Sequence, residues 1–156
     1  MTETLLAVDL GVRTGLALYG RDGRVRWYRS QNFGSAARLR RGAPAVLDAE
    51  PSLAHVVIEG GGSLAAIWER EAGRRGIAAR RVSAERWREL LLLPREQRTG
   101  AQAKQTAELL ARRVIDWSGA PRPTSLRHDA AEAVLAGLWG VIDAGWLEAP
   151  PTALRR

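Results

Sequence analysis

Four acidic residues stand at the ends of predicted secondary-structure elements, where they could act together. Asp9 closes one short apolar run, and Glu59 closes a second run at 54–58. Asp129 and Glu132 are three residues apart, so on a helix they would share one face. A carboxylate at the end of a buried strand is costly unless a cation meets it. The four acids are therefore candidate ligands for positively charged ions.

Carboxylates that meet in this way require a counterion or a proton. Two of them about 4 Å apart repel by roughly 4 kcal/mol at an effective dielectric constant of 20, so a cluster needs metal ions or partial protonation. The chain has no cysteine, which excludes a thiolate zinc site, an iron–sulfur cluster and a cysteine nucleophile. Oxygen ligands alone favour Mg²⁺ or Mn²⁺. Two such ions can activate a water and stabilise the leaving oxygen in phosphodiester cleavage.

Each acid also has a simpler interpretation. Asp129 and Glu132 have the spacing of a helix capping pair, and acids in a first helical turn are stabilised by the helix dipole. Asp9 could form a turn before Gly11, and Glu59 could be a surface acid beside glycines. The joint placement of these acids at two strand ends and one helix start favours a common site.

The net charge points to an anionic partner. The sequence has 24 Lys and Arg against 17 Asp and Glu, a formal charge of +7, and Lys104 is its only lysine. A folded domain of this charge is typical of proteins that bind polyanions such as nucleic acid. A phosphate at the predicted helix start would suit Lys104, although a solvated surface charge is the simpler interpretation.

Length and hydropathy indicate one globular domain. The chain has 156 residues, of which 46% are hydrophobic and 26% charged, which excludes a wholly disordered chain. The N-terminus lacks a basic segment followed by a long apolar stretch, and the longest apolar runs are too short to span a bilayer. A cytoplasmic protein without a membrane partner is expected.

The order of predicted elements indicates an α/β fold with one mixed central sheet flanked by helices. Asp22-Gly23 is a hairpin signal, which makes the first three strands an antiparallel meander. Residues 35–50 form either a short helix or a basic loop, and the tail at 148–156 carries two prolines and is expected to be frayed. The strands are expected at 5–10, 15–19, 25–28, 54–58 and 77–82, and the main helices at 64–72, 84–93, 103–117 and 129–144.

Four short segments, in this order, resemble the RuvC family of Holliday-junction resolvases. Residues 6–17 (LAVDLGVRTGLA) resemble the first strand and turn of the family, and residues 57–59 (VIE) resemble its second acidic strand. Residues 99–105 (TGAQAKQ) resemble the stretch that carries a basic residue near the scissile phosphate. Residues 129–133 (DAAEA) resemble the C-terminal pair of acids.

The resemblance implies an RNase H-like domain over residues 1–147, with a five-stranded mixed sheet, that acts as a homodimer. It implies two Mg²⁺ or Mn²⁺ ions per active site and paired nicks across four-way DNA junctions in homologous recombination and DNA repair. A branch-migration complex is a further partner that it suggests. The implied catalytic and metal-binding residues are Asp9, Glu59, Asp129 and Glu132, with Lys104 near the scissile phosphate.

Nucleic-acid contacts are expected from several basic or polar side chains outside the acid cluster. For any one of the arginines, a solvated surface is the simpler interpretation. Arg88 falls where the family has another basic residue. The expected set is Arg13, Thr14, Arg74, Arg75, Arg80, Arg81, Arg88 and Lys104.

The sequence departs from the family at several positions. Leu10 replaces the usual proline, Glu132 replaces the usual aspartate, and glycines at 60–62 stand where the family has an aromatic wedge. His128, beside Asp129, could assist the cluster or face solvent. Two other functions stay open: a YqgF-type RNase H-like nuclease acting on structured RNA, and a non-catalytic basic nucleic-acid-binding module.

Overall fold

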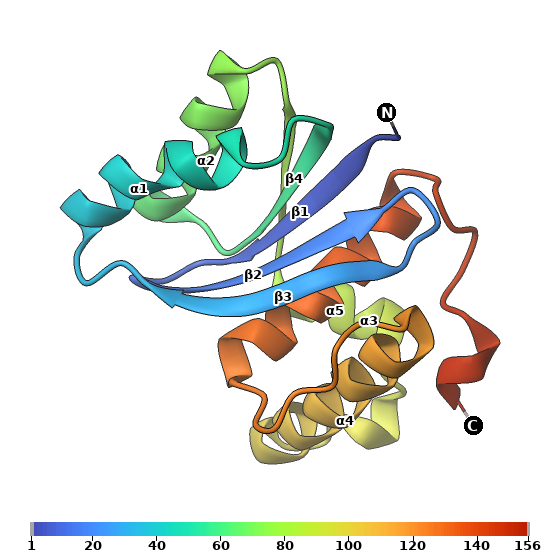
Figure 1. The fold of residues 1–156 in the computed structure, drawn as a ribbon. Coiled ribbons are helices and arrows are strands. Elements are labelled where there is room, and N and C mark those ends of the chain that lie inside the picture. The colour runs from blue at the N-terminus through green and yellow to red at the C-terminus, as the bar shows by residue number, and fades with distance from the viewer. Residues whose placement is uncertain (1, 156) are drawn as a thin grey trace.

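The computed structural model describes residues 2–155, which form a five-stranded sheet with helices on both faces (Figure 1). The strands lie in the order β3-β2-β1-β4-β5. The first three pair antiparallel, and β4 pairs parallel with both β1 and β5. The predicted mixed sheet with an antiparallel start is therefore confirmed. The strands are β1 (Thr4–Asp9), β2 (Arg13–Gly20), β3 (Val25–Asn32), β4 (Leu53–Glu59) and β5 (Ala78–Val82).

Helices cover the two faces of the sheet unequally. α1 (Ala36–Asp48) and α2 (Gly62–Arg74) lie on one face. α3 (Ala84–Leu91), α4 (Gly100–Ser118) and α5 (His128–Asp143) lie on the other (Figure 1). Residues 35–50 thus form a helix rather than a loop, and the Ser35 hydroxyl caps it by accepting from the Arg38 amide at 3.1 Å. No helix that the structure describes is long and apolar enough to cross a membrane.

The alternation of side chains explains why β1 is apolar along its length. Leu6 and Val8 face α1 and α2, whereas Leu5 and Ala7 face α5. A strand covered on both faces needs apolar residues at every position. Asp9 follows Ala7 by two residues and so points to the α5 side.

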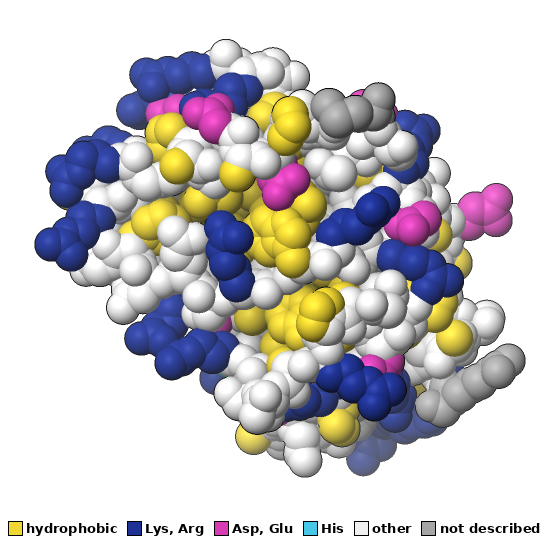
Figure 2. All heavy atoms as spheres, viewed as in Figure 1, with side chains coloured by type: hydrophobic (Ala, Val, Ile, Leu, Met, Phe, Trp, Pro, Cys, Tyr) yellow, Lys and Arg dark blue, Asp and Glu magenta, His cyan; other side chains and the backbone are white. Residues whose placement is uncertain are grey.

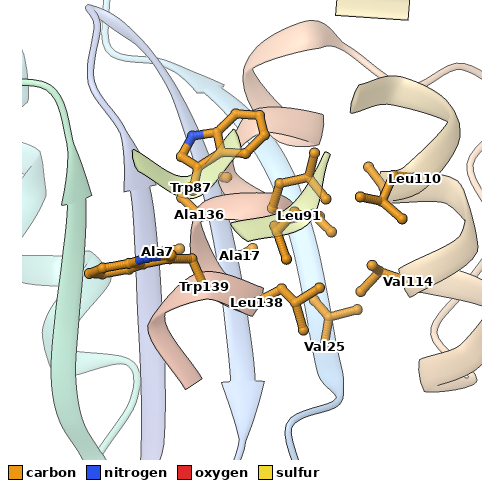
Figure 3. Packing of buried hydrophobic residues seen from close by; sticks show 14 of the residues in the cluster. Ala7, Ala17, Val25, Trp87, Leu91, Leu110, Val114, Ala136, Leu138 and Trp139 are labelled. Carbon is orange, nitrogen blue, oxygen red and sulfur yellow. The ribbon is translucent and has the colours of Figure 1, made fainter. Parts of the chain in front are cut away.

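α5 lies at the centre of the larger core, where every residue from Ala130 to Val141 is buried. It packs closely against the sheet because two of its residues are glycines. A Cβ on Gly137 would lie 2.3 Å from the ring of Tyr19, and one on Gly140 would lie 2.7 Å from Val57. Figure 3 shows this core between the sheet, α3 and α4. The close packing fixes α5 on the sheet across β1, β2 and β4.

The tail predicted to be frayed docks on the protein instead. Thr152–Arg155 form a one-turn 3₁₀ helix, and the Leu154 side chain is only 2% exposed. The Arg113 guanidinium donates to the Leu154 carbonyl oxygen at 3.1 Å, and Arg155 donates to Glu96 at 3.0 Å. Arg155 also donates to the Leu91 carbonyl oxygen. The last residue of the predicted tail, 156, lies outside the described residues.

Candidate active site

One row of residues crosses the whole sheet at the end of β1. Asp9 pairs with Gly15 of β2 on one side and with Glu59 of β4 on the other. Gly15 pairs in turn with Ser30 of β3. Residues in one row of a sheet point to the same face. The register therefore places Asp9 and Glu59 side by side, under the first turn of α5.

The first turn of α5 adds Asp129 to this row. A Cβ on Gly15 would lie 1.9 Å from the Asp129 carbonyl oxygen, so only a residue without a side chain lets the helix approach this closely. The Ser30 hydroxyl donates to Asp129 Oδ2 at 2.9 Å, and the Ala130 amide donates to Oδ1 at 2.8 Å. Both oxygens of Asp129 are thus held by hydrogen bonds.

Glu132 reaches the same place from the next turn of α5 and is only 4% exposed. Its Oε1 lies 3.0 Å from His128 Nε2 and 3.5 Å from the Arg88 guanidinium. Its Oε2 is buried and has no hydrogen-bond partner. His128 therefore lies beside Glu132, while about half of its side chain (51%) is exposed to solvent.

α3 closes the cluster from the side of β5. The Trp87 indole N–H donates to Glu59 Oε1 at 2.7 Å, and the next residue, Arg88, is the one beside Glu132. Two consecutive side chains of one short helix thus contact acids from two different elements.

Burial and the neighbouring acids make ionisation of Asp9 and of Glu132 unfavourable. The pKa of Asp9 is raised far above its ordinary value, first by burial, then by a hydrogen bond with Glu59 and by the charges of Glu59, Glu132 and Asp129. The pKa of Glu132 is also raised, mainly by burial and by the charge of Glu59, although Arg88 acts in the opposite direction. A further positive charge at this place would relieve both effects.

The donor set fits a hard divalent cation. The converging groups are carboxylates, which Mg²⁺ and Mn²⁺ prefer. The buried Glu132 Oε2 has no hydrogen-bond partner, and a bound ion could take that place. Within residues 2–155, no three such side chains are already arranged to coordinate one ion. An ion would therefore require the carboxylates to move closer together than they lie now.

The residues predicted to contact nucleic acid fall into distinct environments. Arg13, at the start of β2, and Lys104, in the first turns of α4, are exposed and form no ion pair within residues 2–155. Arg88 instead contacts Glu132. Thr14 is fully buried, and its hydroxyl donates to the Gly11 carbonyl oxygen at 2.7 Å. The expectation that Thr14 contacts nucleic acid is therefore corrected, because its side chain supports the β1–β2 turn.

The other predicted arginines form ion pairs with acids of this chain. Such pairs satisfy part of each charge before any ligand binds. The pairs are Arg74 with Glu71 at 2.9 Å, Arg75 with Asp48 at 2.7 Å and Glu71 at 2.9 Å, Arg80 with Asp143 at 3.1 Å, and Arg81 with Glu69 at 2.6 Å. Arg74, Arg80 and Arg81 are largely exposed and stay candidates for nucleic-acid contacts.

Sequence reasoning missed two residues that hold the acids. Ser30 gives no local signal, because its role depends on the register across three strands. Trp87 is fully buried, but its N–H also donates to Glu59. A tryptophan directly before a predicted site residue, Arg88, was the available hint.

The fold is similar to that of a solved Holliday junction resolvase. The chain superposes on the yeast mitochondrial Holliday junction resolvase Ydc2 with a TM-score of 0.55 and 12% sequence identity, covering 93% of this chain and 82% of that chain. The catalytic core domain of BIV integrase matches with a TM-score of 0.35 and 12% identity, over 85% of this chain and 80% of that one. No family model and no curated protein matches the sequence. The chain therefore has an RNase H-like fold.

Proposed function

We propose that this protein is a metal-dependent nuclease that cuts four-way DNA junctions by paired nicks, in homologous recombination and DNA repair. The observation that carries the proposal is the convergence of Asp9, Glu59, Asp129 and Glu132 from three separate elements on one partly buried site. The resemblance of the four motif segments to the RuvC family and the likeness in fold to Ydc2 support the choice of substrate.

In this proposal the acids hold two Mg²⁺ or Mn²⁺ ions, which when bound would activate a water and stabilise the charge on the leaving oxygen. Asp9 and Glu59 bind from the strand ends, and Asp129 and Glu132 bind from α5. Ser30 keeps Asp129 oriented through its hydroxyl. Lys104 is proposed to lie near the scissile phosphate, where its ammonium group would offset the phosphate charge.

The test is cleavage of labelled four-way junctions by the purified protein, with linear duplex DNA and structured RNA of the same sequences in parallel. We expect nicking of the junction with Mg²⁺, no nicking with EDTA, and loss of nicking in Asp9→Asn. Asp22→Asn is the matched control. It makes the same chemical change at an exposed hairpin turn, and Asn-Gly preserves that turn.

Cleavage that survives EDTA or Asp9→Asn would overturn the metal-dependent mechanism. Metal-dependent cleavage of structured RNA alone would keep the mechanism and replace the substrate. Salt-sensitive binding of nucleic acid without cleavage would favour the non-catalytic binding module. The proposed homodimer, which would present two sites for paired nicks, is tested by the molar mass in sedimentation equilibrium.

A further inference from the structure

Trp87 combines complete burial with a hydrogen bond to an acid of the candidate site. Its side chain is 0% exposed, and it belongs to the core cluster with Leu91 and Ala136 (Figure 3). Its indole N–H donates to Glu59 Oε1 at 2.7 Å. The ring is therefore fixed by packing, and its polar atom is directed at a carboxylate.

The hydrogen bond constrains Glu59 in a specific way. An indole nitrogen is a donor only, so the oxygen that it contacts must be an acceptor. Glu59 also lies close enough to Asp9 and Glu132 for its charge to raise the pKa of both carboxyl groups. The tryptophan thus holds one oxygen of Glu59 while the carboxylate as a whole faces the other acids.

A second buried tryptophan shows that packing alone does not require this bond. Trp68 of α2 is also 0% exposed, on the opposite face of the sheet, but its indole nitrogen is buried without a hydrogen-bond partner. Both residues fill core volume, and only Trp87 places its N–H on a candidate metal ligand. Matched substitutions of the two tryptophans therefore distinguish the effect of core packing on metal binding from the effect of the hydrogen bond to Glu59.

We propose that Trp87 is a positioning residue that orients Glu59 for metal binding. This inference rests on the proposed function, and Trp87 itself would contact neither the substrate nor an ion. A donor that fixes a liganding carboxylate preorganises it, and loss of such a partner typically weakens metal affinity about 10- to 100-fold. Trp87 acts from α3, so the orientation of Glu59 depends on the docking of that helix.

The experiment measures Mn²⁺ binding by isothermal titration calorimetry, without nucleic acid, for the wild type, Trp87→Phe and Trp68→Phe. We expect Trp87→Phe to weaken Mn²⁺ binding about 10-fold or more. We expect Trp68→Phe to change the Mn²⁺ affinity by less than about twofold, because the Trp68 indole N–H has no hydrogen-bond partner. Addition of Mg²⁺ should also change the indole emission of the wild type and of Trp68→Phe, and this change should be largely lost in Trp87→Phe.

A second replacement keeps the test decisive if phenylalanine unfolds the core. Incorporation of 3-benzothienylalanine at position 87 preserves the bicyclic ring and deletes only the N–H. Unchanged Mn²⁺ affinity in this folded variant would overturn the positioning role. Failure of the wild type itself to bind Mn²⁺ or Mg²⁺ would instead overturn the proposed function, so the two failures are distinguishable.

Discussion

At Asp9, the features that suit a metal ligand oppose ionisation in the free protein. Burial and the neighbouring acids raise the pKa of this carboxyl group in the folded state. The folded protein then binds the proton more tightly than the unfolded chain, so the group favours folding most at low pH. This contribution is lost as pH rises from the ordinary value of 3.8 towards the raised one. The free protein should therefore lose stability as pH increases across this range.

This reasoning predicts opposite effects of Asp9→Asn on stability and activity. A neutral amide removes the unfavourable charge, so in EDTA at pH 8 the variant should melt a few degrees above the wild type, since about 1 kcal/mol corresponds to roughly 2–4 °C at this size. Cleavage should be abolished. Calorimetry from pH 5 to 9 should show a shallower decline of Tm in the variant, with Asp22→Asn matching the wild type. A lower Tm for Asp9→Asn at pH 8 would contradict the burial argument.

At the scale of elements, the contact between β2 and α5 sets the geometry of the site. Gly15 lies between Asp9 and Ser30 in the row across the sheet, and the backbone of α5 rests directly on it. A side chain at this position would push α5 away from the sheet. Asp129 would then move away from Asp9 and from Ser30.

Gly15→Ala should therefore destabilise the fold and impair the site together. The added methyl meets a backbone oxygen that cannot rotate away, so we expect a loss of about 1–3 kcal/mol in unfolding free energy and weaker Mn²⁺ binding. Gly73→Ala in α2 is the control, because nothing lies within 4 Å of its added Cβ, and alanine is the better helix former. If both substitutions changed the unfolding free energy in urea equally, the α5 backbone could not lie as close to Gly15 as the structure places it.

The C-terminal 3₁₀ helix offers a second test at this scale. Leu154→Ala should lower the unfolding free energy by about 2 kcal/mol, the lower end for a buried leucine, because its side chain joins the core beside α4. Thr152→Ala, at an exposed position of the same turn, should change it by less than about 0.5 kcal/mol. A tail that contributes nothing would give equal urea midpoints for both variants.

Elements could be predicted from the sequence where local pattern decides structure. Apolar runs bounded by turn residues predicted the sheet, and their terminal acids predicted Asp9 and Glu59 as neighbours, which the register confirms. Contacts between distant segments could not be predicted in this way. Ser30 reaches Asp129 across 99 positions of sequence, and the short tail with its prolines gave no sign that Leu154 docks on α4. Both depend on the folded topology.

At the scale of the whole molecule, the distribution of charge over the surface should affect nucleic-acid binding more than the net charge does. Figure 2 shows dark blue side chains spread over the visible face, with a group of them over α1 and acidic side chains interspersed. Several arginines predicted to bind phosphate are paired with acids, whereas Arg13 forms no such pair within residues 2–155 and lies two residues from Gly15. Unpaired cations near the site should dominate binding.

Arg13→Gln and Arg74→Gln test this distinction with the same chemical change. Removal of one phosphate contact should reduce the slope of log K against log salt by about 0.9 for duplex DNA. We expect this reduction for Arg13→Gln and little change for Arg74→Gln, since Glu71 holds the Arg74 guanidinium. Fluorescence anisotropy with labelled junctions at several salt concentrations gives both slopes. A larger reduction for Arg74→Gln would place the DNA path over α2 instead.

The row that joins Ser30, Gly15, Asp9 and Glu59 also limits how this chain can vary in length. Side chains alternate along a strand, so one residue inserted within β1 would turn the Asp9 carboxyl to the opposite face of the sheet. Insertions and deletions should therefore be tolerated in the 21–24 hairpin turn, at the far end of the sheet, and be inactivating between residues 5 and 9. A scan of single-codon insertions would map that boundary directly.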